Sequence, residues 1–187
     1  MEHTVSSTSF TTIYDSFLTR VTSEMYMELT ELDTYPMLQE LLINAIPRFE
    51  FPRFDIFDYE EGYVEQGTYQ GLESNNELVP ATLWVGGSFH SILTIEEINI
   101  LSLYMVVEWL GQQLATTENT VTKYSGSDFK FASQANHMSK LKILIDAYKA
   151  DAFNLQRLYK RRKKSADGQI RSTLSQLMEV PAYGYKV

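Results

Sequence analysis

The sequence predicts a mainly α-helical fold: a small helical bundle with a long C-terminal helix and an inserted β-hairpin or β-rich loop over about residues 47–93. Apolar residues at helical spacing within 10–21 and 131–159 indicate amphipathic helices that bury one face. Residues 47–93 lose this period and are rich in aromatic residues, Gly and Pro, which is typical of strands joined by turns. We therefore expect a helical domain over 1–164 with this insertion, and a C-terminal docking tail over 165–187.

The N-terminal region predicts two short helices. Ser9 or its neighbour Thr8 is a candidate N-cap for the first helix. The second helix is predicted to begin near residues 33–34 with Pro36 in its first turn, and Pro47 ends it. Both helices carry an apolar face, formed by Phe10, Ile13, Tyr14, Phe17, Leu18 and Val21 in the first and by Leu38, Leu41, Leu42, Ala45 and Ile46 in the second.

The insertion predicts a pair of strands. Residues 63–65 and 82–85 alternate in polarity, and turn-forming residues lie between them at 73–76. A long β-rich segment in a small helical protein is usually functional, so we expect its aromatic residues to contact another subunit or a partner protein. These residues are Phe51, Phe54, Tyr63, Tyr69, Trp84 and Phe89.

A buried central helix is predicted after the insertion. Thr94 and Glu97 fit a capping box, the S/T-x-x-E pattern that marks a helix N-terminus. The residues over 98–110 are apolar nearly all round, interrupted by Glu108, and a helix without a polar face is buried. Gly111 weakens the pattern.

The last predicted helix runs over 128–164 and would be roughly 55 Å long. This length exceeds the expected diameter of the domain, so its far end should project or be covered by another subunit. Its apolar seam has the steps of three and four residues that are typical of helix packing. The seam consists of Phe131, Ala135, Met138, Leu141, Ile145, Tyr148, Ala152, Leu155 and Tyr159.

The far end of this helix carries five consecutive cations in the stretch LYKRRKK, although the chain has a net charge of -8. Residues 1–100 have a net charge of -14 and residues 101–187 of +6, so copies of the chain could associate through opposite charges. The basic run favours contact with an acidic protein surface. Contact with the phosphates of duplex DNA and a merely solvated helix end remain open.

The tail after the basic run keeps apolar side chains that a solvated peptide does not need, which favours docking on a partner. The candidate residues for binding a partner protein or a neighbouring copy are Arg157, Lys160, Arg161, Arg162, Lys163, Lys164, Leu174, Leu177, Met178, Tyr183 and Tyr185.

The sequence shows no pattern of a catalytic, metal-binding or cofactor-binding site. The chain has no Cys, and His3, His90 and His137 lack neighbours at metal-ligand spacing. Neither a nucleophile elbow nor a phosphate-binding glycine loop is present. We expect no catalytic site, cofactor or metal, and hence no enzyme. No signal peptide or membrane span is predicted, so we expect a cytoplasm-like compartment unless a larger assembly carries the protein out.

Four segments resemble one protein family. They are FEFPRF (49–54), LTIEE (93–97), YSGSDFKFASQANH (124–137) and LQRLYKRRK (155–163). Their arrangement resembles the head–tail connector proteins of tailed bacteriophages, virion proteins of the neck that act as adaptors or in head completion. The resemblance covers roughly residues 10–165.

This resemblance implies a homo-oligomeric ring of about twelve copies, a dodecamer, below the phage portal protein. Each copy would be a small helical bundle with a β-rich loop. The C-terminal segment would dock on or into the portal, and the opposite face would receive the next neck or tail-completion protein. Double-stranded DNA would pass through the ring without being read. The protein would assemble in the host cytoplasm and reside in the virion neck, with no membrane contact.

The basic run also supports an alternative function. The chain could be a cytoplasmic DNA-binding accessory protein that uses the helix end over 157–164 on the phosphate backbone.

Overall fold

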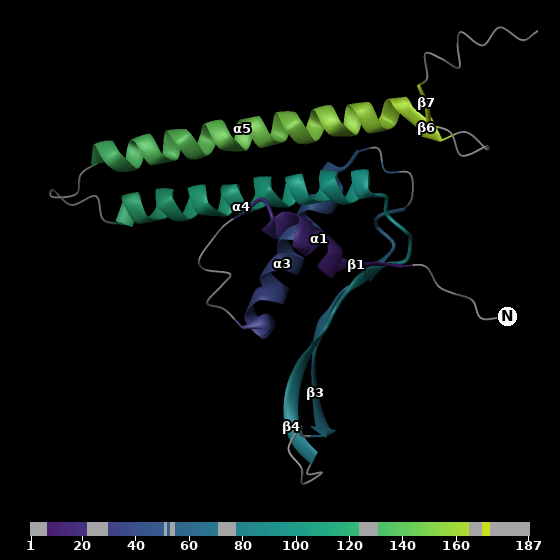
Figure 1. The fold of residues 1–187 in the computed structure, drawn as a ribbon. Helices are drawn as coiled ribbons and strands as arrows, with labels where there is room; N and C mark the ends of the chain where they lie inside the picture. The colour runs from purple at the N-terminus through teal and green to yellow at the C-terminus, as the bar shows by residue number, and fades with distance from the viewer. Residues whose placement is uncertain are drawn as a thin grey trace, which may run out of the picture.

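The computed structural model describes residues 7–21, 30–50, 52, 55–70, 78–123, 131–164 and 170–172. Within these residues the protein is mainly helical with small antiparallel sheets, as the sequence predicts. The predicted helical bundle with a β-hairpin insertion is therefore confirmed (Figure 1).

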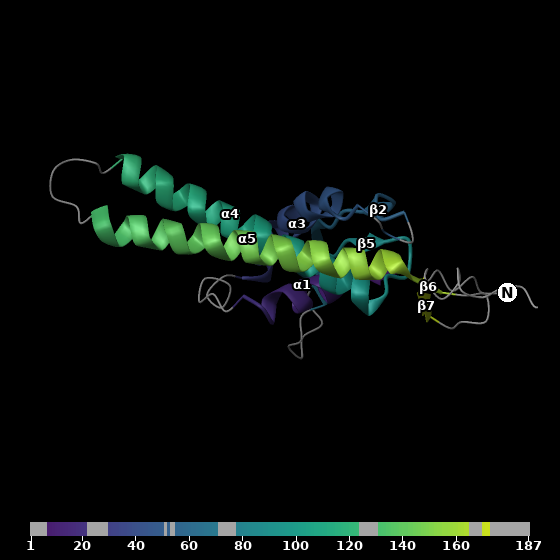
Figure 2. The same cartoon turned by 90° about the horizontal axis from the view of Figure 1, so that it is seen from above.

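Two long helices form the upper part of the molecule. Helix α4 (Ile95–Lys123) and helix α5 (Phe131–Arg161) lie side by side and antiparallel. Helices α1 (Phe10–Leu18) and α3 (Glu31–Ala45) pack against the other side of α4, so α4 lies between them and α5 (Figures 1 and 2). A short 3-10 helix, η1 (Ile46–Arg48), follows α3 directly.

The core surrounds the first half of α4, which confirms the predicted central helix. Nearly all side chains from Ile100 to Leu110 are buried, and α1 and α3 contribute the residues of their predicted apolar faces. Beyond Gly111, α4 leaves this body together with the N-terminal half of α5 (Figure 1). The end of the helix pair that projects is therefore the end opposite to the basic run. Of the two predicted alternatives, projection of the basic end is wrong, and its coverage by another subunit stays a prediction.

A small sheet closes the body beside α1. It has the order β1 (Thr8–Ser9), β5 (Ser88–Phe89) and β2 (Tyr59–Glu60), and both pairings are antiparallel. The rings of Phe10, Tyr59 and Phe89 pack on one another, with centroid distances of 4.9 Å from Phe89 to Phe10 and 6.0 Å from Phe89 to Tyr59. This aromatic cluster joins the two ends of the predicted insertion to the start of the chain.

The predicted hairpin is a two-stranded ribbon that extends away from the body (Figure 1). Strand β3 (Tyr63–Gln70) pairs antiparallel with β4 (Leu78–Val85), from Tyr63↔Val85 to Gln70↔Leu78. We call this ribbon, residues 63–70 and 78–85, the arm. The predicted turn at 73–76 lies outside the described residues.

Specific contacts fix the base of the arm to the body. The buried side chain of Gln39 in α3 donates to the carbonyl of Gly62 at 3.2 Å and accepts from its amide at 2.7 Å. The Trp84 ring stacks on Tyr35 at 6.3 Å, and Tyr35 stacks on Tyr14 at 6.1 Å. A Cβ at residue 62 would lie 2.6 Å from Trp84, so only Gly fits there. The direction in which the arm leaves the body is therefore set by packing.

Several predicted helix ends differ from the observed ones. Helix α3 begins at Glu31, so Pro36 lies inside the helix and not in its first turn. Helix α5 ends at Arg161, and the next three residues form β6 (Arg162–Lys164), which pairs antiparallel with β7 (Ile170–Ser172). Like charges one turn apart disfavour a helix, which gives a physical reason for this earlier end.

Candidate functional site

The predicted basic residues lie at the end of α5. Arg157, Lys160, Arg161 and Arg162 are all exposed on its last turns and at the start of β6. The backbone of Lys163 and Lys164 forms β6, but their side chains lie outside the described residues. The predicted tail residues also lie outside them, namely Leu174, Leu177, Met178, Tyr183 and Tyr185.

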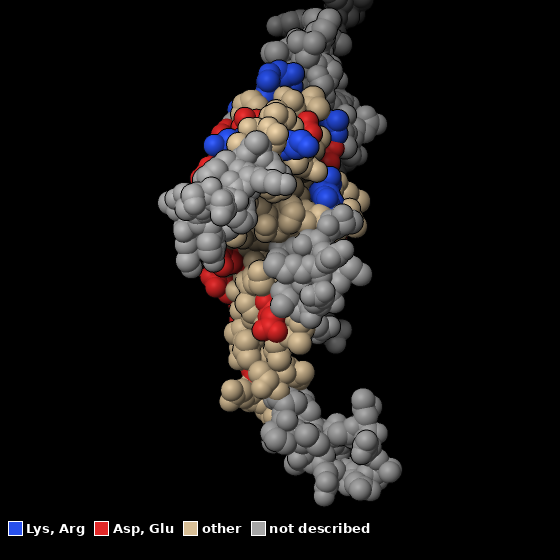
Figure 3. Space-filling view, turned by 90° about the vertical axis from the view of Figure 1, so that its left-hand side faces the viewer, with Lys and Arg blue, Asp and Glu red and all other residues tan. Residues whose placement is uncertain are grey.

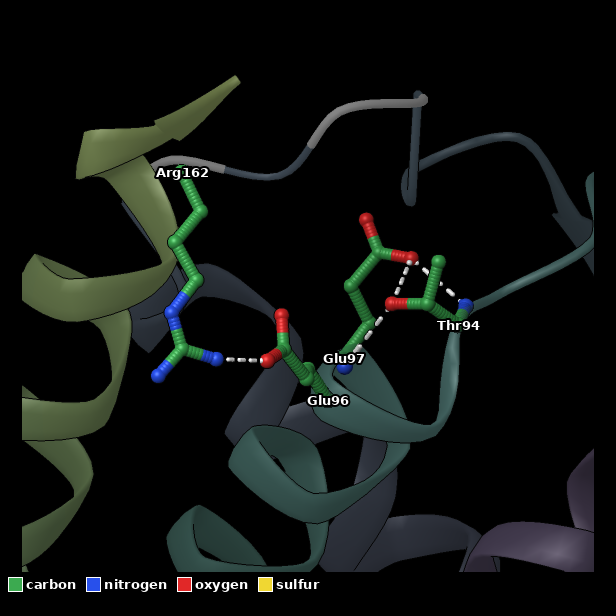
Figure 4. Close-up of polar contacts among 4 residues, drawn as sticks. All are labelled: Thr94, Glu96, Glu97 and Arg162. Atoms are coloured by element: carbon green, nitrogen blue, oxygen red, sulfur yellow. Dashed lines mark hydrogen bonds and ion pairs between the residues drawn. The ribbon is translucent and has the colours of Figure 1, made fainter. Parts of the chain in front are cut away.

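Polar contacts join the end of α5 to the start of α4. The hydroxyl group of the buried Tyr159 donates a hydrogen bond to Oε1 of Glu97, which is itself fully buried. One residue earlier on α4, Glu96 forms an ion pair with Arg162 (Figure 4). The basic run is thus attached to the body through its flanking residues.

The predicted capping box is confirmed, and it provides the Glu97 carboxylate. Oε2 of Glu97 accepts from the amide of Thr94 at 2.7 Å and from its hydroxyl at 2.9 Å, while the Glu97 amide donates to Thr94 Oγ1 at 3.3 Å (Figure 4). Buried carboxylates require such donors, because desolvation penalises the charge. One carboxylate therefore holds both the start of α4 and the end of α5.

Another buried polar side chain, Gln156, lies about one turn earlier on α5. Gln156 is only 1% exposed; its Nε2 donates to the Tyr104 hydroxyl at 2.7 Å, and its Oε1 accepts from the Glu50 amide at 3.1 Å. Burial raises the pKa of Tyr104, and the nearby Glu50 carboxylate raises it further. The Phe49 ring packs edge-on against Tyr159 with a centroid distance of 5.7 Å.

The predicted seam of α5 is correct in part. Leu141, Ile145, Ala152 and Tyr159 are buried, but Leu155 is 41% exposed. Gln156 occupies the buried position instead. Residues 155 and 156 lie three and four residues after Ala152, so both fit helical spacing and only the packing decides between them. Ala135 in the predicted seam is also exposed, because it lies on the projecting part of the helix.

An apolar surface borders this site. A shallow groove of about 70 Å³ is lined by Asn99, Leu155, Leu158 and Arg162, among other residues. Leu158 is 46% exposed, and Ile95, four residues before Asn99 on α4, is 77% exposed. We call the residues Ile95, Leu155, Leu158 and Arg161 the helix-end patch. Large apolar side chains gathered on a surface beside cations indicate a contact site.

The aromatic residues predicted for subunit contacts have different positions. Tyr63 is exposed on the arm, whereas Trp84 packs against α3 at its base. Phe89 is fully buried in the small sheet, so the prediction that it contacts another protein is wrong. Phe51, Phe54 and the side chain of Tyr69 lie outside the described residues.

Catalytic or metal-binding arrangements are not seen among the described residues. No group of three or more His, Asp or Glu side chains is placed there to hold a metal ion. The sequence also did not indicate a contact of one histidine: His90 Nδ1 lies 2.8 Å from Asp58 Oδ1, 32 residues earlier. Both side chains are largely exposed, and no described hydroxyl group is hydrogen-bonded to this His ring.

No helix within the described ranges is long and apolar enough to cross a membrane. Comparisons with protein-family models, curated proteins and solved structures find no match for this chain.

Proposed function

We propose that this protein is a structural protein of the tailed-phage neck, an adaptor whose ring joins the portal to the tail. The observation that carries the proposal is that three of the four resembling segments meet at one place. Phe49 of FEFPRF packs on Tyr159 of LQRLYKRRK, and Tyr159 bonds to Glu97 of LTIEE. Segments that converge in space, though far apart in the sequence, support a shared structural role for these motifs.

The end of α5, with the helix-end patch, is suited to binding a partner protein. Arg157, Lys160 and Arg161 are exposed beside the apolar side chains of the helix-end patch. Exposed cations next to an apolar surface favour a partner with the complementary character, an acidic surface with apolar side chains. In the proposed neck, this partner is the portal or a neighbouring copy, and residues 165–187 dock beside it.

The charge distribution also suits a ring through which DNA passes. Residues 1–100 have a net charge of -14, so a channel lined by this half would repel phosphates and let the duplex slide. The proposed assembly has about twelve copies, takes up the next neck or tail-completion protein on its opposite face, and resides in the virion after assembly in the host cytoplasm. The proposed role is binding and not catalysis.

Co-purification with the portal protein of the same phage tests this function. We expect the chain to bind the portal and to form a ring, alone or on the portal, as measured by size exclusion with light scattering. Replacing Arg157, Lys160 and Arg161 by Glu should abolish portal binding. The control replaces Lys142, which pairs with Glu118 on the projecting end, by Glu. No association with the portal together with no ring in either setting would reject the proposal, whereas a soluble monomer alone would not.

The exposed cations on the last turns of α5 also support the second candidate, a DNA-binding accessory protein. It predicts an affinity for duplex DNA that falls as salt rises and falls when Lys160 and Arg161 become Ala or Gln. Undetectable or salt-independent binding at low ionic strength rejects this candidate.

A further inference from the structure

We call the face of the arm that carries Tyr63, Glu65 and Leu83 its open face; the other face packs on the body only at its base, and Val64 on that face is 47% exposed. The register of the arm places Tyr63 and Glu65 on the same face, together with Leu83, the cross-strand partner of Glu65. Trp84 belongs to the other face, which packs on Tyr35 of α3 at the base. Tyr63 and Leu83 are 53% and 44% exposed. A two-stranded ribbon is marginally stable by itself, so apolar side chains left in water on a ribbon with a fixed base indicate a contact surface.

The charge around this open face has one sign. The chain has no Lys or Arg between residues 54 and 122, while this stretch contains 11 acidic residues. Glu60, Glu61 and Glu65 are exposed at the base and on the arm. Figure 3 shows the side of the molecule that lies on the left in Figure 1. On this side the described Lys and Arg side chains lie only over the upper part, whereas the part below carries acidic and uncharged side chains. The arm is therefore an apolar surface bordered by negative charge.

The helix-end patch has the complementary character. Ile95, Leu155 and Leu158 provide exposed apolar surface, and Arg161 lies one turn after Leu158 on α5. Apolar surfaces bordered by opposite charges are the usual basis of specific protein contacts, because the apolar part supplies affinity and the charges supply orientation.

One copy cannot join its own two surfaces. Helix α5 lies on one side of the body, and the arm leaves from the opposite side (Figures 1 and 2). We propose that the open face of the arm binds the helix-end patch of the next copy, with Glu65 beside Arg161 of that copy. Such a head-to-tail contact joins different surfaces of identical chains, and it closes into a ring when the rotation between copies permits. This inference rests on the proposed function, because it names the contact that would build the proposed ring.

Site-directed cross-linking can test the contact, because the chain has no Cys. Two single variants, Leu83→Cys on the arm and Leu158→Cys on the patch, are mixed at high protein concentration and treated with a short bismaleimide linker. We expect a cross-linked dimer that contains one chain of each kind. The double variant Leu83→Cys/Leu158→Cys should give a ladder of linked oligomers.

The matched control replaces Leu158→Cys by Ile143→Cys. Ile143 is also an apolar α5 residue and is 68% exposed, but it lies outside the helix-end patch. We expect at least a tenfold lower cross-linking yield with this control. Equal yields for the two pairs, or no cross-link in solution and on the portal, overturn the inference. A link within one chain between Leu158→Cys and Leu177→Cys would show that the C-terminal segment covers the patch, and it would overturn the inference too.

A charge exchange gives an independent readout. Glu65→Arg and Arg161→Glu should each weaken self-association, because like charges then meet at the contact. Mixing the two variants should restore it, because every contact between unlike copies then pairs opposite charges. No restoration, in variants whose circular dichroism is unchanged, contradicts the proposed orientation. The two proposals fail in distinguishable ways. Rings on the portal without the cross-link reject only the arm contact, whereas a cross-linked dimer with neither portal association nor a ring in either setting rejects only the neck function.

Discussion

Tyr159, near the end of α5, donates a hydrogen bond to Glu97, in the first turn of α4, and both side chains are buried. The Glu97 carboxylate also accepts from the amide and the hydroxyl of Thr94 in the capping box. The carboxylate that caps the start of α4 thus also holds the end of α5. This carboxylate therefore helps to position the basic run, together with the ion pair between Glu96 and Arg162.

Tyr159→Phe removes the donor and keeps the ring. We expect the free energy of unfolding to fall by about 1.5–3 kcal/mol, the usual range for a hydrogen bond to a charged group. Urea unfolding followed by circular dichroism measures this change. Tyr148→Phe, at a half-buried position of the same helix, is the control and should change stability by less than about 0.5 kcal/mol. Equal effects of the two substitutions would show that the Glu97 bond does not stabilise the fold.

Gln156→Leu would make the α5 seam continuously apolar, yet we expect it to destabilise the protein. The substitution removes the acceptor of the Glu50 amide and the donor to the Tyr104 hydroxyl. Leaving buried polar groups unpaired costs about 1–3 kcal/mol, which exceeds the gain from one more buried apolar side chain that fits the site poorly. Urea unfolding gives the value. The control Leu155→Gln, at the neighbouring exposed position, should change the free energy of unfolding little. A Gln156→Leu protein at least as stable as the wild type would contradict this account.

Much of the fold could be predicted from the sequence, because local patterns determine it. Helical periodicity predicted α1, α3 and α5. The S/T-x-x-E pattern at Thr94 and the apolar run after it predicted α4. Alternation with an intervening turn signal identified the arm. These signals need only residues that lie close together in the chain.

The site could be predicted only in part, because its contacts join distant residues. Tyr159 and Glu97 are 62 residues apart, and Gln156 and the Glu50 amide are 106 apart. Hydrophobicity favoured Leu155 for the seam, since no local pattern shows that the Glu50 amide lies within hydrogen-bond distance of Gln156. The burial of Phe89 likewise follows from its packing on Phe10 and Tyr59, which no spacing indicates.

Gly62→Ala should loosen the arm from the body. The added Cβ would lie 2.6 Å from both Trp84 Cζ2 and the Val85 carbonyl oxygen, and the contact with Gln39 would have to shift. We expect a loss of about 1–3 kcal/mol in unfolding free energy and faster chymotrypsin cleavage within residues 63–85. Trypsin cannot report on the arm, because residues 54–122 contain no Lys or Arg.

Gly86→Ala is the matched control for this prediction. A Cβ at residue 86 would meet no atom within 4 Å, although the residue also lies at the base of the arm. We expect its cleavage rate to equal that of the wild type. If both alanine variants are cleaved alike, the close contact at Gly62 does not hold the arm.

Tyr14→Phe should make the protein less sensitive to alkali. Burial raises the pKa of Tyr14 well above its ordinary value, and the nearby Tyr35 raises it further. The folded protein therefore keeps this hydroxyl protonated where the unfolded chain ionises it. Its stabilising contribution is complete below about pH 10 and is lost as the pH rises beyond that value.

The substitution removes this group, and the buried Tyr14 hydroxyl has no hydrogen-bond partner among the described residues. At pH 7 we expect the stability of Tyr14→Phe to equal or exceed that of the wild type by up to about 1 kcal/mol. Above pH 10 the wild type should lose up to about 1.4 kcal/mol more per pH unit than the variant. Urea unfolding at pH 7, 9 and about 11 separates these effects. Parallel pH profiles would mean that the Tyr14 hydroxyl ionises in the folded protein as readily as in the unfolded chain.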